Sequence, residues 1–345
     1  MGLQEFWFIL IAVLFTGYFV LEGFDFGVGM LMPVLGRTDT RRRVLINTIG
    51  PVWDGNEVWL IVGGGALFAA FPDWYATLFS GFYLPLLIIL VALILRIVAI
   101  EWRGKIDDDK WRWRADLGIM IGSWVPAVLW GVAFANIVRG VAINADKKVT
   151  ANFFELLNPY ALLGGITTAL VFALHGAVFI ALKTADDVRV DAADLAKKLA
   201  IPTVPIAGGF VLWTQLAYGK GWTWILVAIA AAAVLALVAL TRAEREGWAF
   251  TLTTIAIIAT VVLLFASLYP NVMPSTTDPA YNLTIHNASS SHYTLTVMSW
   301  AAVILTPIVL IYQGWTYWVF RKRISTKQIP PSIGLPPKAG TSKVG

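Results

Sequence analysis

The stretch Asn47-Thr-Ile-Gly-Pro-Val-Trp-Asp-Gly-Asn-Glu-Val-Trp-Leu60 opens a hydrophobic segment that is long enough to cross a bilayer. It nevertheless carries two acidic residues, Asp54 and Glu57, in its first turns. The preceding hydrophobic segment carries two more, Glu22 and Asp25. A carboxylate in hydrocarbon is costly unless it is paired, hydrated or protonated. Two neighbouring segments that both accept this cost predict a shared polar site, with the rest of the chain as its scaffold.

The composition is that of a membrane protein. Hydrophobic residues make up 58% of the 345 residues and charged residues only 14%, whereas soluble proteins have about 25% charged residues. The net charge of +5 comes from basic residues in short loops, which indicates membrane topology rather than nucleic-acid binding. The absence of cysteine excludes disulfides, thiolate metal sites and cysteine nucleophiles. An acidic start without a basic region makes a cleaved signal peptide unexpected.

The hydropathy pattern predicts an all-α polytopic membrane protein with about nine transmembrane helices. Residues 1–320 are expected to form a single transmembrane domain, and residues 321–345 a basic, proline-rich, disordered cytoplasmic tail. The sixth helix is the least regular, because it is short and starts with two prolines. The predicted spans are approximately 6–33, 47–71, 78–100, 117–139, 159–182, 201–218, 222–241, 248–268 and 294–320.

The distribution of Lys and Arg predicts the orientation. With the N-terminus outside and the C-terminus inside, the inside segments and the tail hold 21 of the 26 basic residues, and the outside segments hold four. Such a split is a strong positive-inside signal. The one remaining basic residue, Arg96, lies within the third predicted span.

The charged residues of the first three spans are expected at similar depths. Asp25 and Asp54 lie 12 and 11 residues from the nearest arginine of the first inside loop, which corresponds to about 16–18 Å along a helix. Arg96 lies seven residues from the next inside loop, or roughly 10 Å. The three groups therefore fall in the same half of the membrane. We expect Arg96 to stabilise a carboxylate there and to be shared by Asp25 and Asp54.

The acids form two pairs, because Glu22 precedes Asp25 by three residues and Asp54 precedes Glu57 by three, so each pair shares a helix face. Like charges in a medium of low dielectric constant cannot both ionise cheaply, so one acid of each pair is expected to keep its proton. These four acids and Arg96 predict a proton route. The alternative is a buried ion pair that only fixes the register of the helices.

Three other features have simpler interpretations. The single histidine within a span, His175, is expected to be a hydrogen-bonded packing residue. Because a bis-axial haem needs two facing ligands, this chain alone is not expected to hold a haem, and no metal site is predicted. Trp53, directly beside Asp54, is expected to line the polar site rather than to form part of an interfacial belt. Small residues at helical spacing predict close helix packing: Gly23 and Gly27, Gly118 and Gly122, and Gly63-Gly64-Gly65.

Several blocks along the chain resemble one family. The blocks are Gly23-Phe-Asp-Phe-Gly-Val-Gly-Met30, Leu35-Gly-Arg37, Ile49-Gly-Pro-Val-Trp-Asp-Gly-Asn-Glu-Val-Trp-Leu60, Gly64-Gly-Ala-Leu-Phe-Ala-Ala70, Ser80-Gly-Phe-Tyr83, Gly122-Ser-Trp-Val-Pro126, Phe153-Phe-Glu-Leu-Leu-Asn-Pro159 and Tyr269-Pro-Asn-Val-Met-Pro-Ser275. Together they are similar to subunit II of the cytochrome bd quinol oxidases. The resemblance covers the chain in order up to about residue 320.

The resemblance implies a respiratory complex in the bacterial cytoplasmic membrane. A partner, subunit I, would carry the haems b and d and the quinol site, and the two chains would form a heterodimer. This chain would fold as two four-helix bundles plus one helix, support subunit I, and contribute proton and oxygen access to the oxygen-reducing haem. Asp25, Asp54 with Trp53, and Arg96 fall at the family's functional positions. A structural quinone in this chain and small accessory subunits are left open.

Two other functions compete with this interpretation. A proton-coupled secondary transporter would also be a polytopic bundle with intramembrane acids and no redox centre. A purely structural subunit would only assemble a partner. Haem that co-purifies with a second chain would separate the oxidase from the transporter. A neutral variant of Asp54 that assembles but turns over slowly would separate a proton route from a scaffold.

Overall fold

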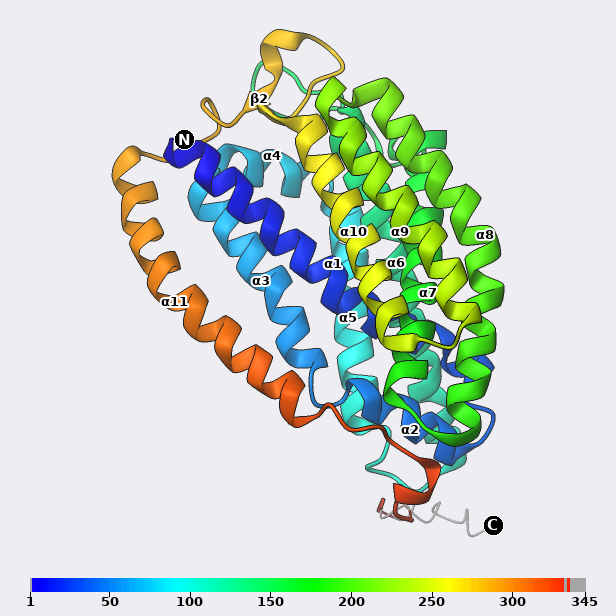
Figure 1. Cartoon of the computed structure of the whole chain (residues 1–345). Coiled ribbons are helices and arrows are strands. Elements are labelled where there is room, and N and C mark those ends of the chain that lie inside the picture. Colours follow the sequence, from blue (N-terminus) through cyan, green and yellow to red (C-terminus); the bar gives the residue numbers. More distant parts are fainter. Residues whose placement is uncertain (1, 332–333, 336–345) are drawn as a thin grey trace, which may run out of the picture.

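The structure is a computed structural model that describes residues 2–331, 334 and 335. It is a bundle of long helices with the N-terminus at one end, and the segment that follows the last helix leaves from the other end (Figure 1). The α-helices of the described residues are α1 (Leu3–Leu35), α2 (Asp39–Ile49), α3 (Trp53–Ala70), α4 (Pro72–Gly81), α5 (Tyr83–Trp102), α6 (Asp109–Arg139), α7 (Pro159–Lys183), α8 (Asp186–Tyr218), α9 (Trp224–Arg242), α10 (Glu246–Leu268) and α11 (His292–Val319).

Short elements connect these helices. They are the 3₁₀ helices η1 (Phe153–Leu156), η2 (Gly221–Thr223), η3 (Pro279–Tyr281) and η4 (Thr326–Gln328), and the strands β1 (Asn271–Met273) and β2 (Leu283–Thr284). The two strands pair antiparallel within the connection between α10 and α11. The longest predicted outside loop is therefore partly ordered by its own small sheet.

Eight helices of the described chain are long and apolar enough to cross a membrane: α1, α5, α6, α7, α8, the helix around α9, α10 and α11. The remaining predicted span, the second (residues 47–71), corresponds to α3, which packs along α1 (Figure 1). Its first two turns carry Asp54, Asn56 and Glu57, so its apolar part is short. The predicted all-α polytopic class is confirmed, with α3 as a span of mixed character.

The second predicted span is wrong at its start. The sequence predicts one helix from residue 47, but α2 ends at Ile49 and α3 begins at Trp53. Pro51 has no amide hydrogen with which to continue the α2 ladder, so the helix stops there. Thr38 caps the other end of α2, because its side chain accepts a hydrogen bond from the Arg41 amide. The amphipathic α2 is thus a separate element between two membrane helices.

Two further boundaries differ from the predicted spans. Residues 78–81 belong to the short helix α4, and the third span begins only at Tyr83. The sixth span is not short, because α8 continues through the predicted inside loop 183–200 and contains both Pro202 and Pro205. The charged half of α8 still buries a stripe of small residues at helical spacing, Ala192, Ala196 and Ala200. An amphipathic half-helix of this kind does not give a hydropathy signal.

Glycine allows the closest helix crossing. A Cβ atom on Gly27 of α1 would lie 2.1 Å from the carbonyl oxygen of Phe172 and 2.7 Å from the Cα of Gly176, both on α7. The predicted packing role of Gly27 is therefore confirmed. The run at residues 63–65 behaves differently, because Gly64 and Gly65 of α3 have no described atom within 4 Å of such a Cβ position.

The segments predicted to lie inside converge at one end of the bundle. Ion pairs join them, among them Arg42–Asp116 at 2.9 Å, Arg103–Asp39 at 2.8 Å and Arg41–Asp191 at 2.5 Å. This convergence agrees with the expectation that these segments share one side of the membrane. Which side they face stays a prediction.

The described part of the C-terminal segment has defined contacts, whereas the sequence predicts disorder from residue 321. The Ile324 amide donates to the carbonyl of Lys183 at 2.8 Å. The Arg43 guanidinium donates to the carbonyl of Pro330 at 2.7 Å. For the rest of the predicted tail, residues 332–333 and 336–345 lie outside the described residues.

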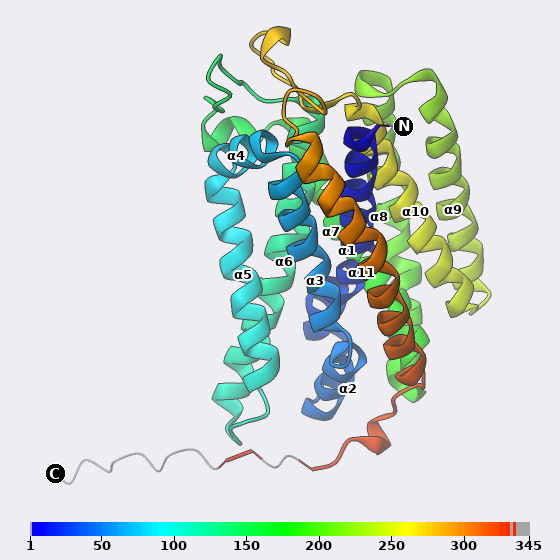
Figure 2. The same ribbon diagram turned by 90° about the vertical axis from the view of Figure 1, so that its left-hand side faces the viewer.

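Helix α11 stands apart from the other helices. It crosses α3 on the outside of the bundle (Figure 2), and Leu295 is its only buried residue in the described chain. Near its N-terminal end the Trp7 indole N–H donates to the Ser299 hydroxyl at 3.0 Å. Most of the α11 surface is therefore not covered by the residues that the structure describes.

Candidate functional site

Arg96 on α5 lies at the centre of a buried charged cluster. Its guanidinium donates a hydrogen bond to the Glu22 carboxylate of α1, and its Nη1 lies 3.5 Å from Oε1 of Glu57 on α3. The guanidinium carbon also lies 4.7 Å from the centre of the Phe26 ring, which is a cation–π contact. The side chains of Arg96 and Glu22 are 1% and 0% exposed. Three helices thus meet around one buried arginine.

The close approach of α5 and α6 fixes the position of the Arg96 side chain. A Cβ atom on Gly122 of α6 would lie 2.4 Å from Cβ of Arg96 and 2.5 Å from the carbonyl oxygen of Ala92. Only glycine fits between these backbones. The packing role predicted for Gly122 is therefore confirmed, and it brings the base of the Arg96 side chain to the helix interface.

Asp25 lies one turn from Glu22 and is also buried. Its Oδ2 accepts a hydrogen bond of 2.7 Å from the side-chain amide of Asn56 on α3. The side-chain oxygen of Asn56, Oδ1, in turn accepts hydrogen bonds from Tyr317 at 2.7 Å and from Gln313 at 3.3 Å, both on α11. A hydrogen-bonded network therefore runs from α1 through α3 to α11.

Sequence reasoning missed Asn56, Gln313 and Tyr317. Asn56 had a signal, because it is a polar residue within the same membrane segment as Asp54 and Glu57. No sequence signal marked the two α11 residues, because a glutamine and a tyrosine in the last span are typical of ordinary interfacial residues.

The structure does not pair Asp54 with Arg96. Asp54 is exposed, and the described ion pairs of Arg96 go to Glu22 and Glu57. The expectation that Asp25 and Asp54 share Arg96 is therefore wrong. The expectation for Asp54 assumed one continuous helix from residue 47. Because α3 instead begins at Trp53, the side chains of α3 point in other directions than a continuous helix would give them.

Trp53 and Asp54 are adjacent in the first turn of α3, but only Trp53 is buried. Trp53 is 8% exposed and belongs to the hydrophobic core. Asp54 lies at the helix N-terminus, where the backbone dipole favours a negative charge. Asp54 remains beside Glu57 on the same helix, at the point where the cluster reaches the surface of this chain.

Several polar atoms of the cluster are buried without a hydrogen-bond partner among the described residues: Glu22 Oε2, Asp25 Oδ1, Arg96 Nε and Arg96 Nη2. Such an atom costs about 1–3 kcal/mol when it is left unsatisfied. Three carboxyl groups also face one guanidinium in a low-dielectric interior, so at least one of them is best accommodated as a neutral acid. The cluster is therefore suited to hold and exchange protons.

His175 of α7 is a packing residue in this structure. Its Nδ1 lies 2.6 Å from the hydroxyl of Thr253, and its Nε2 lies 3.1 Å from the carbonyl oxygen of Val20. Its ring stacks on Phe250 with 4.6 Å between the ring centres. Both ring nitrogens are engaged, so neither fits a haem iron without breaking a hydrogen bond. The described residues also contain no cluster of three or more His, Cys, Asp or Glu that could hold a metal ion.

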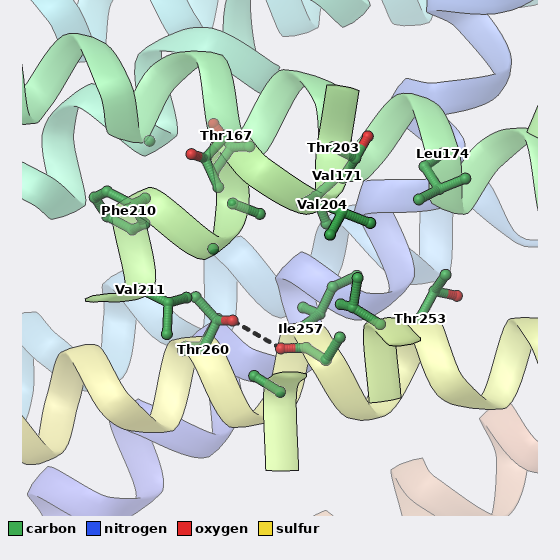
Figure 3. Close-up of a pocket in the computed structure, with 18 of the residues that line it drawn as sticks. Thr167, Val171, Leu174, Thr203, Val204, Phe210, Val211, Thr253, Ile257 and Thr260 are labelled. Carbon is green, nitrogen blue, oxygen red and sulfur yellow. Dashed lines mark hydrogen bonds between the residues drawn. The ribbon is translucent and has the colours of Figure 1, made fainter. Parts of the chain in front are cut away.

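The helices also enclose two cavities, and the larger of them adjoins the network of Asn56. One, of about 280 Å³, is enclosed by apolar side chains of α7, α8 and α10 together with α6 and α9 (Figure 3). Thr167 lines it and is 3% exposed, and its hydroxyl has no hydrogen-bond partner among the described residues. The other, of about 930 Å³, lies between α1, α10 and α11 and is lined by Gln313 and Tyr317 of the network described above.

Comparisons with known proteins agree with this architecture. Residues 3–320 match the family described as cytochrome bd terminal oxidase subunit II. The chain is 45% identical over 332 residues to the cytochrome bd ubiquinol oxidase subunit 2 of Bacillus subtilis, covering 95% of this chain and 98% of that protein. It is 36% identical over 365 residues to the cytochrome bd-I ubiquinol oxidase subunit 2 of Escherichia coli K12, covering 95% and 96%.

The fold also matches a solved structure. The bd oxidase from Geobacillus thermodenitrificans superposes with a TM-score of 0.76 and 18% identity, over 93% of this chain and 100% of that one. The family match replaces the transporter interpretation. The chain belongs to the cytochrome bd terminal oxidase subunit II family and is a multi-pass membrane subunit of an oxidoreductase complex.

Proposed function

We propose that this chain is the subunit of a quinol:oxygen oxidoreductase that carries no haem ligand and supplies protons to its partner. The relatives from Bacillus subtilis and Escherichia coli are both named ubiquinol oxidase subunits. We assign the haems b and d and the quinol site to subunit I. For the haems the reason is that His175, which lies within α7, already uses both ring nitrogens. The complex lies in the bacterial cytoplasmic membrane.

The surface for subunit I lies on α3, α5 and α11. Asp54 is exposed on α3, and an exposed carboxylate at membrane depth is costly unless protein covers it. Further along α3, Gly64 and Gly65 line a groove of about 620 Å³ between α3 and α5, which offers space for close packing of a partner helix. The unpartnered surface of α11 lies on the same side of the bundle as α3 (Figure 2).

The observation that carries the proton route is the cluster of Glu22, Asp25 and Glu57 around Arg96. Arg96 is bonded to Glu22 and to Glu57, and Asp25 lies one turn from Glu22 on α1. Neighbouring buried carboxyl groups can pass protons between them, and the guanidinium balances their charge. Asp54 lies where this cluster meets the surface proposed for subunit I, next to Glu57 on α3. The route leads from the inside surface into the cluster and leaves toward the partner.

The haem of the partner supplies the oxygen chemistry. Within this chain, Arg96 compensates the charge that remains when a carboxyl group gives up its proton. Asn56 holds Asp25 in place through its 2.7 Å hydrogen bond. The surrounding helices exclude bulk water, which keeps protons on the defined groups.

A structural quinone suits the smaller cavity. The walls of this cavity are mostly apolar, which favours a prenyl tail, and the buried Thr167 hydroxyl has no hydrogen-bond partner in the described part of the chain (Figure 3). A quinone carbonyl would satisfy that hydroxyl. Thr167 would orient the ring, and the side chains of α8 and α10 would enclose the tail.

Purification through a tag on this chain tests the proposed function. We expect a second chain and a visible haem spectrum in the purified complex, and no haem when this chain is expressed alone. Stoichiometric haem on the isolated chain would overturn the assignment of the haems to subunit I. Absence of haem from a complex that contains both chains would overturn the oxidase itself.

A further inference from the structure

A directed series of hydrogen bonds links α11 to Asp25. The Trp59 indole N–H donates to Oε1 of Gln313 at 2.8 Å. The Gln313 amide N–H then donates to Oδ1 of Asn56 at 3.3 Å, and the Asn56 amide N–H donates to Oδ2 of Asp25 at 2.7 Å. Each residue of the series therefore donates to the next one toward Asp25.

The direction of the series follows from the chemistry of its first member. An indole nitrogen can only donate, so Gln313 must turn its oxygen toward Trp59 and its NH₂ toward Asn56. Asn56 then turns its oxygen toward α11 and its NH₂ toward Asp25. The Tyr317 hydroxyl reinforces this orientation, because it donates to the same Asn56 oxygen at 2.7 Å.

We propose that Gln313 and Tyr317 are positioning residues, which act through Asn56 to present an N–H donor to the Asp25 carboxylate. Asn56 is fully buried, so no bulk water competes for its orientation. The importance of this donor for turnover rests on the proposed proton route through Asp25. The orientation of Asn56 is independent of that route.

The consequence for Asp25 is a bias toward its ionised form. A donor stabilises a carboxylate, whereas a flipped Asn56 would place its oxygen against Asp25, which only a protonated acid can satisfy. The charged groups around Asp25 are Glu22 on its own helix, Glu57 on α3 and Arg96 on α5. From α11 the titratable group is Tyr317 itself.

The other polar groups near Asp25 are held by contacts that do not involve Gln313 or Tyr317. On α7, the imidazole of His175 is engaged by Thr253 and by the Val20 carbonyl. The described hydrogen bonds and ion pairs of Glu22, Glu57 and Arg96 join these residues to one another and not to α11, so shortening an α11 side chain removes none of them. A change in Asp25 after such a substitution therefore reports on Asn56.

Helix α11 is the element through which this control could be exerted. Few of its residues contact the rest of the chain, and Gln313 and Tyr317 line the 930 Å³ cavity between α1, α10 and α11. A displacement of the inner half of α11 would remove both donors from Asn56 at once. The state of Asp25 is then coupled to the position of a helix that lies at the surface proposed for subunit I.

Infrared titration of the purified complex tests the proposal. The carboxyl band of Asp25 is assigned by its loss in Asp25→Asn, and the pH at which it is half lost is measured. In Tyr317→Phe and in Gln313→Met we expect this midpoint to rise, by about one pH unit, because a donor to a charged group is weakened. The shift should be smaller in Gln313→Met, whose bond to Asn56 is longer.

Two comparisons make the test specific. Tyr312→Phe removes a hydroxyl from the same helix that has no hydrogen bond among the described residues, and it should leave the midpoint unchanged. In an Asn56→Ala background, Tyr317→Phe should add no further shift, because the two residues act as one unit. Haem content reports that each complex has assembled, and Gln313→Met decides the matter if Tyr317→Phe assembles poorly.

An unchanged midpoint in the assembled α11 variants would overturn the positioning role. An equal shift in Tyr312→Phe would also overturn it, because the effect would then not depend on Asn56. A shifted midpoint with an unchanged pH profile of turnover would leave the positioning role intact and remove Asp25 from the proton route. Failure of the inference and failure of the proposed function are thus distinguishable.

Discussion

Arg96 and Glu22 form an ion pair inside the membrane domain, although they lie 74 residues apart and their side chains are 1% and 0% exposed. Removing one partner leaves the other charge buried and uncompensated. We therefore expect Arg96→Met to destabilise the complex by about 3–5 kcal/mol. Thermal unfolding followed by loss of haem absorption measures the effect.

The double variant Arg96→Met, Glu22→Met is the matched control. Because it removes both charges, it should recover much of the stability that the single variant loses. A single variant as stable as the wild type would show that the pair carries no buried charge.

Asp25→Asn should assemble with normal haem content but turn over slowly. Asparagine preserves the size of the side chain and removes the exchangeable proton of the acid. We expect a decrease of at least about tenfold, largest at high pH where protons are scarce. Oxygen consumption per haem across a pH series measures it, with Asp146→Asn, a substitution of an exposed acid outside the helices, as the control. Normal activity per remaining haem, together with haem loss, would make Asp25 structural.

Asp54→Asn should slow turnover in the same way, because Asp54 stands beside Glu57 where the cluster reaches the surface of this chain. Combining it with Asp25→Asn should give less than the product of the two single effects, since groups in one route fail as a unit. Oxygen consumption of the single and double variants is the measurement. Full activity in Asp54→Asn would remove this residue from the route.

Gly27→Ala should weaken the packing of α1 on α7. The added Cβ would meet the backbone oxygen of Phe172 at 2.1 Å, and a backbone atom cannot rotate away. We expect a loss of about 1–3 kcal/mol, typical of overpacking. Gly247→Ala, where nothing described lies within 4 Å, is the control and should be neutral in thermal unfolding. Equal stability of the two variants would contradict the close crossing.

Thr167→Val should reduce the quinone that co-purifies with the complex. Valine matches threonine in shape and removes the hydroxyl that has no partner among the described residues. The measurement is the amount of quinone extracted per haem, which does not depend on activity. Thr254→Val is the control, because its hydroxyl is bonded to the carbonyl of Phe250 and it does not line the cavity. An unchanged quinone content in Thr167→Val would argue against this cavity as the site.

Reporter fusions should place residue 345 inside and the N-terminus outside. The reason is the excess of Lys and Arg on one set of segments, 21 of the 26 basic residues. The ion pairs that gather these segments at one end of the bundle agree with a common side. An outside location of residue 345 would overturn the predicted orientation.

The sequence by itself determined the class of the protein and the helices that carry its charges. Hydropathy is a local property, so runs of apolar residues identify membrane helices whatever their neighbours are. A charge within such a run is unusual enough to mark a site, which is why Glu22, Asp25, Glu57 and Arg96 could be named in advance. The blocks that resemble one family are also local stretches of sequence, so each could be identified without knowledge of the fold.

Only the tertiary structure decided which of these groups meet. The break at Pro51 changes the direction of the side chains on α3, so Glu57 and not Asp54 turns toward Arg96. The contacts of Asn56 with Asp25 and Tyr317 join residues up to 261 positions apart, and no local pattern predicts them. The direction of a side chain depends on where its helix begins and on what packs against it, and both are set by the whole fold.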